Sequence, residues 1–257
     1  MKWTVLILAG SRGPSDPVAQ AAGVGHKAFA AINGRPMITY VVDTLRAEPR
    51  IERIAASIEK NAPDLPDGVE RIDADDSPAS SLRAAMTKLP TPLLVTTADH
   101  PLLLPEMVSS FLDEAENSPA AALTALCPRE IAERAGNPAR RTYLPFRDGR
   151  ASGTNLFALK TPQTVTVVEF WRRLERLRKS PLRMAMTLGP SLLLRTALGR
   201  LKRADAEKAL ERATGCPVAF AELLHPDAAH DVDSANDLKF VARRLIERQK
   251  IAAPIRE

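Results

Sequence analysis

Three separate segments of this chain carry acids, a lysine and glycines of the kinds that bind a metal ion and a phosphate chain. The clearest is VTTADHPLL at residues 95–103, an apolar run that ends in Asp99. A carboxylate at the end of a buried strand can bind Mg²⁺, which bridges phosphates and neutralises the charge that develops in phosphoryl transfer. The alternative role for Asp99 is a helix cap or a loop hydrogen bond, because an expected helix begins close by at Pro105.

A second acidic segment, HDVDSAND at residues 230–237, lies near the end of the chain. Asp231 and Asp233 are two positions apart, so on an extended segment their side chains point to the same side. A second carboxylate opposite Asp99 would complete a magnesium site that keeps several waters. Asp233 or Ser234 could also cap the helix that follows, and the two roles are compatible. We expect Asp231 or Asp233 as the second ligand, with Asp231 favoured.

The third segment is the glycine-containing loop LAGSRGPSDPVAQAAGVGHKAF, which begins at Leu8. Its backbone amides could cradle phosphate oxygens, and Arg12 and Lys27 supply positive charges. The loop has neither the Gly-Lys-Ser/Thr of a Walker loop nor the spacing of a Rossmann fingerprint. On its own it is more often structural than phosphate-binding. The glycines that could need unusual backbone angles are Gly10, Gly13, Gly23 and Gly25.

Other polar residues near these segments suggest positioning roles. Asn155 in SGTNLFAL could orient an acceptor molecule or satisfy a turn. His26, His100 and His230 each neighbour one of the three segments, and we interpret them as positioning donors rather than general bases. No Ser-His-Asp or Cys-His arrangement is recognisable, which argues against covalent catalysis.

Strands and helices alternate along the first half of the chain. Apolar, β-rich runs predict strands at 3–8, 51–58, 92–99 and 120–128, and helical spacing or capping predicts helices at 36–47, 80–89 and 105–117. This alternation predicts an α/β fold with a doubly wound, mostly parallel sheet. Ligands bind outside the carboxyl ends of the strands in such sheets, so we expect the glycine loop and Asp99 to meet.

The second half of the chain changes character. RTYLPFRDGRASGTNLFAL at 141–159 predicts two strands around an Asp-Gly turn at 148–149. Residues 164–213 read as helical, rich in Arg and Lys and broken by Pro181 and by Gly189-Pro190. A strand at 216–224 and a terminal helix after the acidic loop complete the chain. We interpret residues 1–257 as one domain with a helical insertion at about 164–213.

The helical insertion has two readings. Its basic face comprises Arg172, Arg173, Arg176, Arg178 and Lys179, whereas 188–198 is apolar with one arginine. The simpler reading is an amphipathic subdomain that covers the sheet. The sharper one is that it shapes the acceptor site, for a phosphorylated lipid headgroup at a membrane surface.

Composition sets broad limits. The chain has 257 residues, 45% of them hydrophobic, and a net charge of +5, which suits an anionic small substrate, a membrane face or a polynucleotide about equally. Nucleic-acid binding is disfavoured because the arginines lack a recognised reading motif. Cys127 and Cys216 are isolated, so we expect no disulfide framework or zinc site and a cytoplasmic location. The short apolar start reads as a strand rather than a signal peptide, and no membrane span is expected.

Together and in this order, the segments LAGSRG…GVGHKAF…NGRPM, TTADHPLL and DVDSANDL resemble the motifs of the MobA-like NTP transferases, which are nucleotidyltransferases of the GT-A-type fold. The resemblance covers roughly residues 1–160 and 216–247. It implies attack by an acceptor phosphate on the α-phosphorus of a nucleoside triphosphate, with Mg²⁺ as cofactor and release of pyrophosphate. By this resemblance Asp99 ligates Mg²⁺ with Asp231 or Asp233, and Lys27, Arg12 and Asp99 are the catalytic set. Asn155 stays a candidate acceptor contact from its position in the sequence. The nucleotide contacts implied are Leu8, Ala9, Gly10, Ser11, Arg12 and Lys27.

The chain also departs from the family pattern. Ser11 replaces the usual second glycine, the Arg-Met-Gly that commonly follows is missing, and the closing motif reads SAND. These differences leave CTP and GTP both open and argue against guanylylation of molybdopterin. Two alternative functions are a GT-A-type glycosyltransferase that uses a nucleotide sugar, and a non-catalytic nucleotide-binding or membrane-surface adaptor. A first loop with a lysine suits a triphosphate better than a nucleotide sugar.

Overall fold

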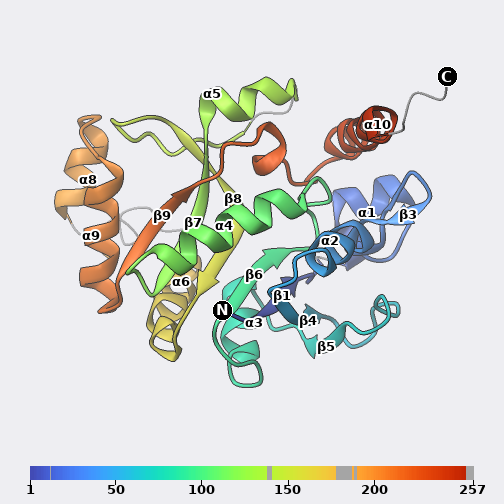
Figure 1. Cartoon of the computed structure of the whole chain (residues 1–257), viewed down its shortest axis with the longest axis horizontal. Coiled ribbons are helices and arrows are strands. Elements are labelled where there is room, and N and C mark those ends of the chain that lie inside the picture. Colours follow the sequence, from blue (N-terminus) through green and yellow to red (C-terminus); the bar gives the residue numbers. More distant parts are fainter. Residues whose placement is uncertain (12, 138–140, 178–186, 188–189, 253–257) are drawn as a thin grey trace.

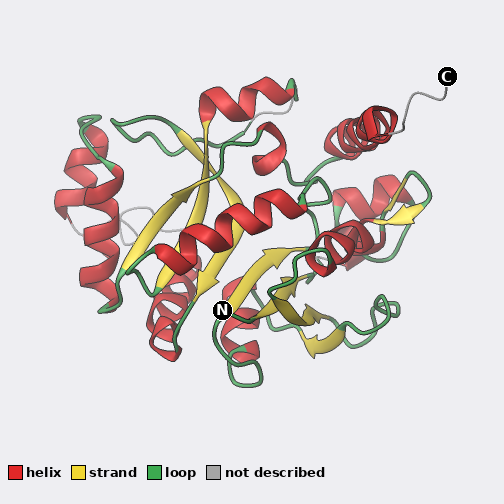
Figure 2. Ribbon diagram, viewed as in Figure 1, coloured by secondary structure: helices red, strands yellow, loops and turns green. Residues whose placement is uncertain are grey.

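A computed structural model gives the structure of the chain and describes residues 1–11, 13–137, 141–177, 187 and 190–252. Its main element is a seven-stranded sheet (Figures 1 and 2). The strands are, in spatial order, β5 (Glu70–Asp73), β4 (Ile51–Ile58), β1 (Trp3–Leu8), β6 (Leu93–Thr97), β8 (Ala151–Leu159), β7 (Ala122–Pro128) and β9 (Val218–Glu222). Of these seven strands, β8 alone runs antiparallel to its neighbours. The expectation of a doubly wound, mostly parallel sheet is confirmed.

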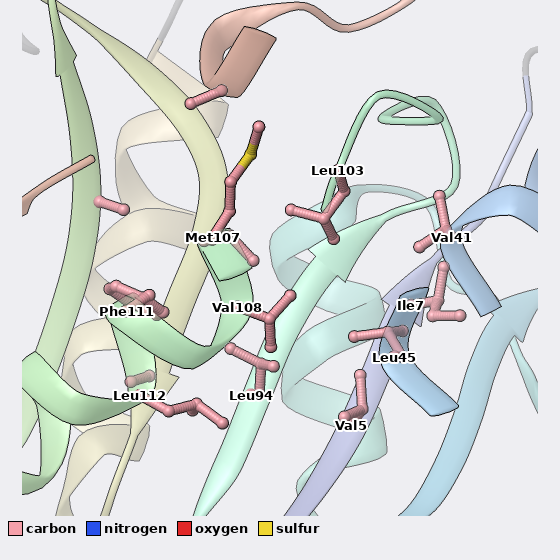
Figure 3. Packing of buried hydrophobic residues seen from close by; sticks show 14 of the residues in the cluster. Val5, Ile7, Val41, Leu45, Leu94, Leu103, Met107, Val108, Phe111 and Leu112 are labelled. Carbon is pink, nitrogen blue, oxygen red and sulfur yellow. The ribbon is translucent and has the colours of Figure 1, made fainter. Parts of the chain in front are cut away.

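Helices pack on both faces of this sheet because its strands are apolar on both sides. In β1, Val5 and Ile7 belong to the core on one face, whereas Leu6 and Leu8 belong to the core on the other. The first core is closed by α2 (Met37–Arg46) and α4 (Pro105–Asn117), as Figure 3 shows for Leu45 of α2 and its neighbours in α4. The second core is closed by α3 (Pro78–Ala85) and α6 (Val165–Leu177).

Local sequence signals fix where the helices begin. Asp16 caps α1 (Pro17–Ala22) and accepts hydrogen bonds from two backbone amides of its first turn. Ser77 caps α3 in the same way, and Pro78 and Pro105 occupy the first turns of α3 and α4, where a missing N–H costs nothing. The helices are therefore specified locally as well as by packing.

Helices α8 (Pro190–Ala197) and α9 (Arg203–Thr214) lie at the β9 end of the sheet (Figure 1). α9 lies against β9 and α6, and α8 lies against α9. Trp171 of α6 stacks on Phe157 of β8, with ring centroids 5.6 Å apart. The expected covering role of α6 and α9 is therefore seen. Of the expected basic face, Arg178 and Lys179 lie outside the described residues, as do Pro181 and Gly189.

The structure corrects one prediction. The segment 141–159 contains one strand rather than two, because only an isolated bridge joins Leu144 to Ala151. Pro145 has no N–H to donate, and the N–H of Arg147 instead donates to the carbonyl of Leu201, which turns this backbone toward the helical segment. Several short elements were not predicted: α1, β5, α5 (Arg129–Ala132) and the ribbon of β2 (Ala31–Ile32) and β3 (Arg35–Pro36).

The chain ends in α10 (Ala235–Ala252), whose apolar residues Phe240, Val241 and Leu245 pack near the glycine loop in a third core cluster. None of the helices in the described parts of the chain combines the length and the apolar character that a membrane crossing needs.

Candidate active site

A small pocket opens at the carboxyl ends of β1 and β6, which are adjacent and parallel, with Leu8 opposite Thr97. From β1 the sheet continues to β4 on one side and to β6 on the other, so this is the point at which the strand order reverses. Crevices at such points bind ligands in open α/β sheets. The pocket is lined by Leu8, Ala9, Gly10, Lys27, Ala28, Met37, Ala98 and Asp99. The structure thus brings the predicted glycine loop, lysine and acid together.

Ser11 organises the glycine loop. Its hydroxyl oxygen accepts hydrogen bonds from the backbone N–H of Gly13, at 3.2 Å, and of Lys27, at 3.4 Å. Gly13 has a φ of 69°, a left-handed conformation that glycine adopts without strain. The serine that replaces the expected second glycine therefore ties the two ends of the loop together. Arg12, the other residue predicted to contact the nucleotide, lies outside the described residues.

Glu59 supports the same loop and was missed by the sequence analysis. It follows β4, and its carboxylate accepts hydrogen bonds from the Ser11 N–H and from the His26 ring, each at 2.8 Å. Burial alone would raise the pKa of Glu59, but these hydrogen bonds outweigh it and the pKa lies below its usual value. Glu59 comes directly after a buried strand, as Asp99 nearly does, so the same reasoning could have found it.

Lys27 lies between two of the predicted metal ligands. Its Nζ is 2.7 Å from Oδ2 of Asp99 and 3.1 Å from Oδ1 of Asp233. Lys27 starts a short 3₁₀ turn, in which the ring of His26 accepts from the N–H of Ala28, so the loop backbone aims the lysine inward. Burial lowers the pKa of Lys27, but attraction to the two carboxylates outweighs it and the pKa lies above its usual value. Lys27 is therefore a fixed positive charge.

Asp231 approaches the site from the other side. Its Oδ1 accepts a hydrogen bond from Arg141, at 2.8 Å, and its Oδ2 accepts one from the amide of Asn155, at 3.4 Å. The loop of Asp231 is joined to the loop of Asp99, because the N–H of Val232 donates to the Asp99 carbonyl at 2.8 Å. The two distant acidic segments thus meet in one crevice.

The electrostatics of Asp231 are unfavourable for a carboxylate. Burial, followed by repulsion from Asp233 and Asp99, raises the pKa of Asp231 to about 6, although Arg141 works in the opposite direction. Any added positive charge nearby stabilises the ionised form of such a carboxylate. Arg141 supplies only part of the charge that these acids need.

The capping of α10 is done by other residues than the predicted metal ligands. The hydroxyl of Ser234 accepts from the N–H of Asp237, at 3.2 Å, and donates to the Asp237 carboxylate, at 2.7 Å. The same carboxylate accepts from the N–H of Asp233. The SAND sequence is therefore a capping motif, and the side chains of Asp231 and Asp233 stay available to the crevice.

Asn155 reaches Asp231 through an irregularity in β8. It has a φ of 54°, in the left-handed region, and the pairing of β8 with β7 shifts register between Thr124 and Leu126. Such bulges re-aim side chains, and Asn tolerates this conformation better than most residues. The strand therefore places the predicted acceptor-binding residue at the edge of the crevice.

The residues present fit a hard divalent cation such as Mg²⁺. Oδ1 of Asp99 is buried and has no hydrogen-bond partner among the described residues, so it is an acceptor without a donor. No group of three or more His, Cys, Asp or Glu in the described parts of the chain could hold a metal ion by itself. Mg²⁺ commonly binds through only one or two carboxylates, because its other ligands come from phosphates and water.

A buried ion-pair cluster supports the acidic loop. Asp227 is fully buried, and its carboxylate accepts from Arg248, at 2.6 Å, and from Arg244, at 3.1 Å, both on α10. Arg248 also donates to the carbonyl of Leu102, at 3.0 Å, three residues beyond Asp99. One cluster thus connects α10 with the loops that carry both sets of acids.

Comparison with known proteins finds a matching family model. The sequence matches the model of the MobA-like NTP transferase domain over residues 5–215. This match includes the helical segment 164–213, which the sequence motifs did not align, and stops before the acidic segment at 230–237. No protein in the curated set matches the sequence significantly.

Solved structures of the same fold include other transferases. A hypothetical transferase from Thermus thermophilus is 29% identical, with a TM-score of 0.80 over 93% of this chain and all of that protein. A 2-C-methyl-D-erythritol 4-phosphate cytidylyltransferase, also from Thermus thermophilus, is 17% identical, with a TM-score of 0.56 over 96% of this chain and all of that one. A CMP:2-keto-3-deoxy-manno-octonic acid synthetase, solved with CTP, is 14% identical, with a TM-score of 0.58 over the same shares.

Proposed function

The chain belongs to the MobA-like NTP transferase family and is a nucleotidyltransferase, and we propose that it transfers a nucleoside monophosphate from CTP or GTP to a small phosphorylated acceptor in a Mg²⁺-dependent reaction. The observation that carries the proposal is the position of Lys27, between Asp99 and Asp233 and beside the glycine loop. A triphosphate needs positive charge and amide donors, and a divalent cation needs carboxylates. The glycine loop, Lys27 and Asp99 line the same pocket, and Asp233 contacts Lys27.

The proposal gives roles to residues of the pocket and of the adjacent acidic loop. We assign Leu8, Ala9, Gly10, Ser11 and Arg12 to nucleotide binding, and Lys27 to contact with the phosphates. Asp99 holds Mg²⁺ together with Asp231 or Asp233. When bound there, the ion neutralises negative charge on the phosphate oxygens.

The reaction needs alignment and charge balance rather than a covalent intermediate. An oxygen of the acceptor phosphate attacks the α-phosphorus, and the bond from that phosphorus to the bridging oxygen breaks. The bonding electrons leave with pyrophosphate. The attacking oxygen is already ionised at neutral pH, so no general base is required. Lys27, whose pKa is raised, stays protonated and balances the charge of the leaving group.

The acceptor side is assigned to Asn155, whose amide lies 3.4 Å from Asp231. Two structural neighbours support the proposed substrates. One is named as a cytidylyltransferase of a phosphate ester, which supports a phosphorylated acceptor, and the other was solved with CTP. GTP is the second candidate nucleotide. We further propose that residues 1–257 act as one domain. We also propose a cytoplasmic location, since Cys127 and Cys216 are both free and buried.

Pyrophosphate release tests the proposal. The protein is incubated with each of the four nucleoside triphosphates, Mg²⁺ and a panel of sugar, polyol and lipid-headgroup phosphates. We expect release with CTP or GTP and one acceptor class. Asp99→Asn and Lys27→Ala should each lower the rate by about 100-fold or more, because each removes a charge that the transition state uses.

The control is Asp113→Asn, which removes a carboxylate of α4 that is 63% exposed and pairs with Arg50. Its rate should equal that of the wild-type protein. Triphosphate binding without turnover under every condition would contradict the proposed function, as would full activity of Asp99→Asn.

A further inference from the structure

Arg141 is an arginine of the crevice that the sequence motifs do not assign. Its side chain is only 12% exposed, and it forms its ion pair with Asp231 through one terminal nitrogen, at 2.8 Å. The other terminal nitrogen donates to the Asp231 carbonyl, at 3.4 Å. The third nitrogen, Nε, is buried and has no hydrogen-bond partner among the described residues. An unmet buried donor is costly, so the guanidinium is incompletely satisfied as it stands.

The partner of Arg141 is itself a candidate cation ligand. The loop of Asp231 is joined to the loop of Asp99 by the bond from the Val232 N–H to the Asp99 carbonyl, and Asn155 contacts the second oxygen of Asp231. A divalent cation at Asp231 and the guanidinium of Arg141 would compete for Oδ1. Lys27 has the same relation to Asp99 and Asp233. In this structure two side-chain cations therefore neutralise the carboxylates that the proposed function gives to a metal ion.

We propose that Arg141 is an internal counter-ion that a divalent cation displaces from Asp231, and that its guanidinium then binds an anionic phosphate group of the acceptor. The identity of the acceptor group rests on the proposed function, whereas the displacement does not. Cation entry thereby converts a self-neutralised crevice into one with a free arginine.

The geometry of a guanidinium suits the second role. Its planar fork binds two phosphate oxygens in parallel, which a lysine cannot do. Arg141 shares Asp231 with Asn155, so the released fork lies on the acceptor side of the crevice and not beside the glycine loop. Lys27 stays with the triphosphate, and the two substrates are held by different cations.

Binding of Mn²⁺ to the protein without nucleotide tests the displacement. Free Mn²⁺ is measured by electron paramagnetic resonance for the wild-type protein, Arg141→Met, Asp231→Asn and the double variant. We expect Arg141→Met to bind Mn²⁺ about tenfold more tightly, because the ion no longer competes for Oδ1. In the Asp231→Asn background the same change should have an effect of less than about twofold.

Two further variants distinguish displacement of Arg141 by the cation from the general effect of removing a positive charge. Arg129→Met removes an arginine of α5 that is 44% exposed and pairs with Glu133, and it should leave Mn²⁺ affinity unchanged. Arg141→Lys keeps the charge and is the usable variant if Arg141→Met does not fold. It should bind Mn²⁺ within about threefold of wild type but bind phosphate at least about tenfold more weakly.

Binding of inorganic phosphate tests the second role. The triphosphate site is first saturated with an analogue of CTP or GTP that carries a methylene in place of the α–β bridging oxygen, and phosphate is then titrated by calorimetry. We expect phosphate to bind at least about tenfold more tightly with Mg²⁺ than without it, and this gain should be absent in Arg141→Met and Arg141→Lys.

If Arg141→Met changes the Mn²⁺ affinity equally in the wild-type and the Asp231→Asn backgrounds, the displacement is overturned. Equal changes would show a long-range effect of charge rather than competition for Asp231. Phosphate binding that ignores both Mg²⁺ and Arg141 would overturn the acceptor role. These outcomes differ from failure of the proposed function, which appears as missing pyrophosphate release and leaves the nucleotide-free Mn²⁺ measurements intact.

Discussion

Two buried histidines accompany the acids of the crevice. His100 follows Asp99 and His230 precedes Asp231, and both side chains are almost completely buried. Burial lowers the pKa of each to about 4, so both are uncharged at neutral pH. They add no positive charge to the site, which leaves neutralisation of the acids to Lys27, Arg141 and any bound cation. Their interpretation as positioning donors stays a prediction, since both ring nitrogens of His100 and Nδ1 of His230 are buried without a hydrogen-bond partner among the described residues.

These histidines make the protein sensitive to acid. Their pKa is near 6.5 in the unfolded chain and about 4 in the folded protein, so the unfolded state binds protons first as the pH falls. The stability they contribute is present above about pH 6.5 and is lost as the pH falls toward about 4. At about pH 5.5 the loss should be about 1 kcal/mol for each histidine relative to about pH 7.5. Urea denaturation at the two pH values measures it.

A variant isolates the histidine contribution, because Asp231, whose pKa is raised, acts in the opposite direction over part of the same range. His230 stacks on Phe240, with centroids 5.4 Å apart, so His230→Phe keeps the ring contact and removes the titration. The loss of stability between the two pH values should shrink by about 1 kcal/mol. An unchanged pH dependence would show that His230 does not resist protonation in the folded state.

At the scale of elements, strand β8 both completes the sheet and orients a residue of the site. It joins β6 to β7 by antiparallel pairing, and its irregularity at Asn155 turns that side chain toward Asp231. The backbone of Asn155 is left-handed, with a φ of 54°. Side chain and backbone therefore make separable demands on this position.

Two substitutions at Asn155 separate those demands. Asn155→Gly should change the free energy of unfolding by less than about 0.5 kcal/mol, because glycine adopts the left-handed conformation freely. Asn155→Ala should cost about 1–2 kcal/mol, because alanine does not. Both remove the amide, so both should lower pyrophosphate release by about tenfold. If the Ala and Gly variants have the same free energy of unfolding, a side chain at position 155 does not strain the left-handed backbone.

Most helices and strands near the site could be predicted from the sequence. Capping and apolar periodicity placed α2, α3 and α4 and the parallel strands, because those signals are local. They also predicted that the glycine loop and Asp99 meet, because parallel strands bring their carboxyl ends to one edge. Asp231 was brought to the same site only by its acidic motif. The second strand expected in 141–159 was wrong because the bond from Arg147 to Leu201 joins residues far apart in the chain. Arg141 was hidden in a run of basic residues, and only its pairing with Asp231 distinguishes it.

At the scale of the whole molecule, the buried cluster of Asp227, Arg244 and Arg248 connects the C-terminal helix to the candidate catalytic edge of the sheet. Burial by itself raises the pKa of Asp227, but the two arginines outweigh it and hold the pKa below its usual value. The carboxylate is therefore ionised at neutral pH without contact with water. The cluster is thus a second link between the two acidic loops, beside the hydrogen bond from Val232 to Asp99.

Removal of that charge should be costly. Asp227→Asn leaves two arginines without their buried carboxylate, and we expect a loss of about 3–5 kcal/mol in the free energy of unfolding by urea. Asp113→Asn breaks an arginine pair at the surface and should cost less than about 1 kcal/mol. Equal, small effects in the two variants would show that the cluster does not hold the acidic loops in place.

The central position of β8 also determines when the sheet can be completed during synthesis. β6 and β7 precede it in the chain but do not pair with each other, and only β8 bridges them. A nascent chain that has not yet released residues 151–159 from the ribosome therefore carries a sheet of β5, β4, β1 and β6 with an open edge at β6. It also carries a single strand, β7, without a partner, since β9 follows β8 in the chain. This interval is the one in which the polypeptide most needs a chaperone, because unpaired edges template aggregation.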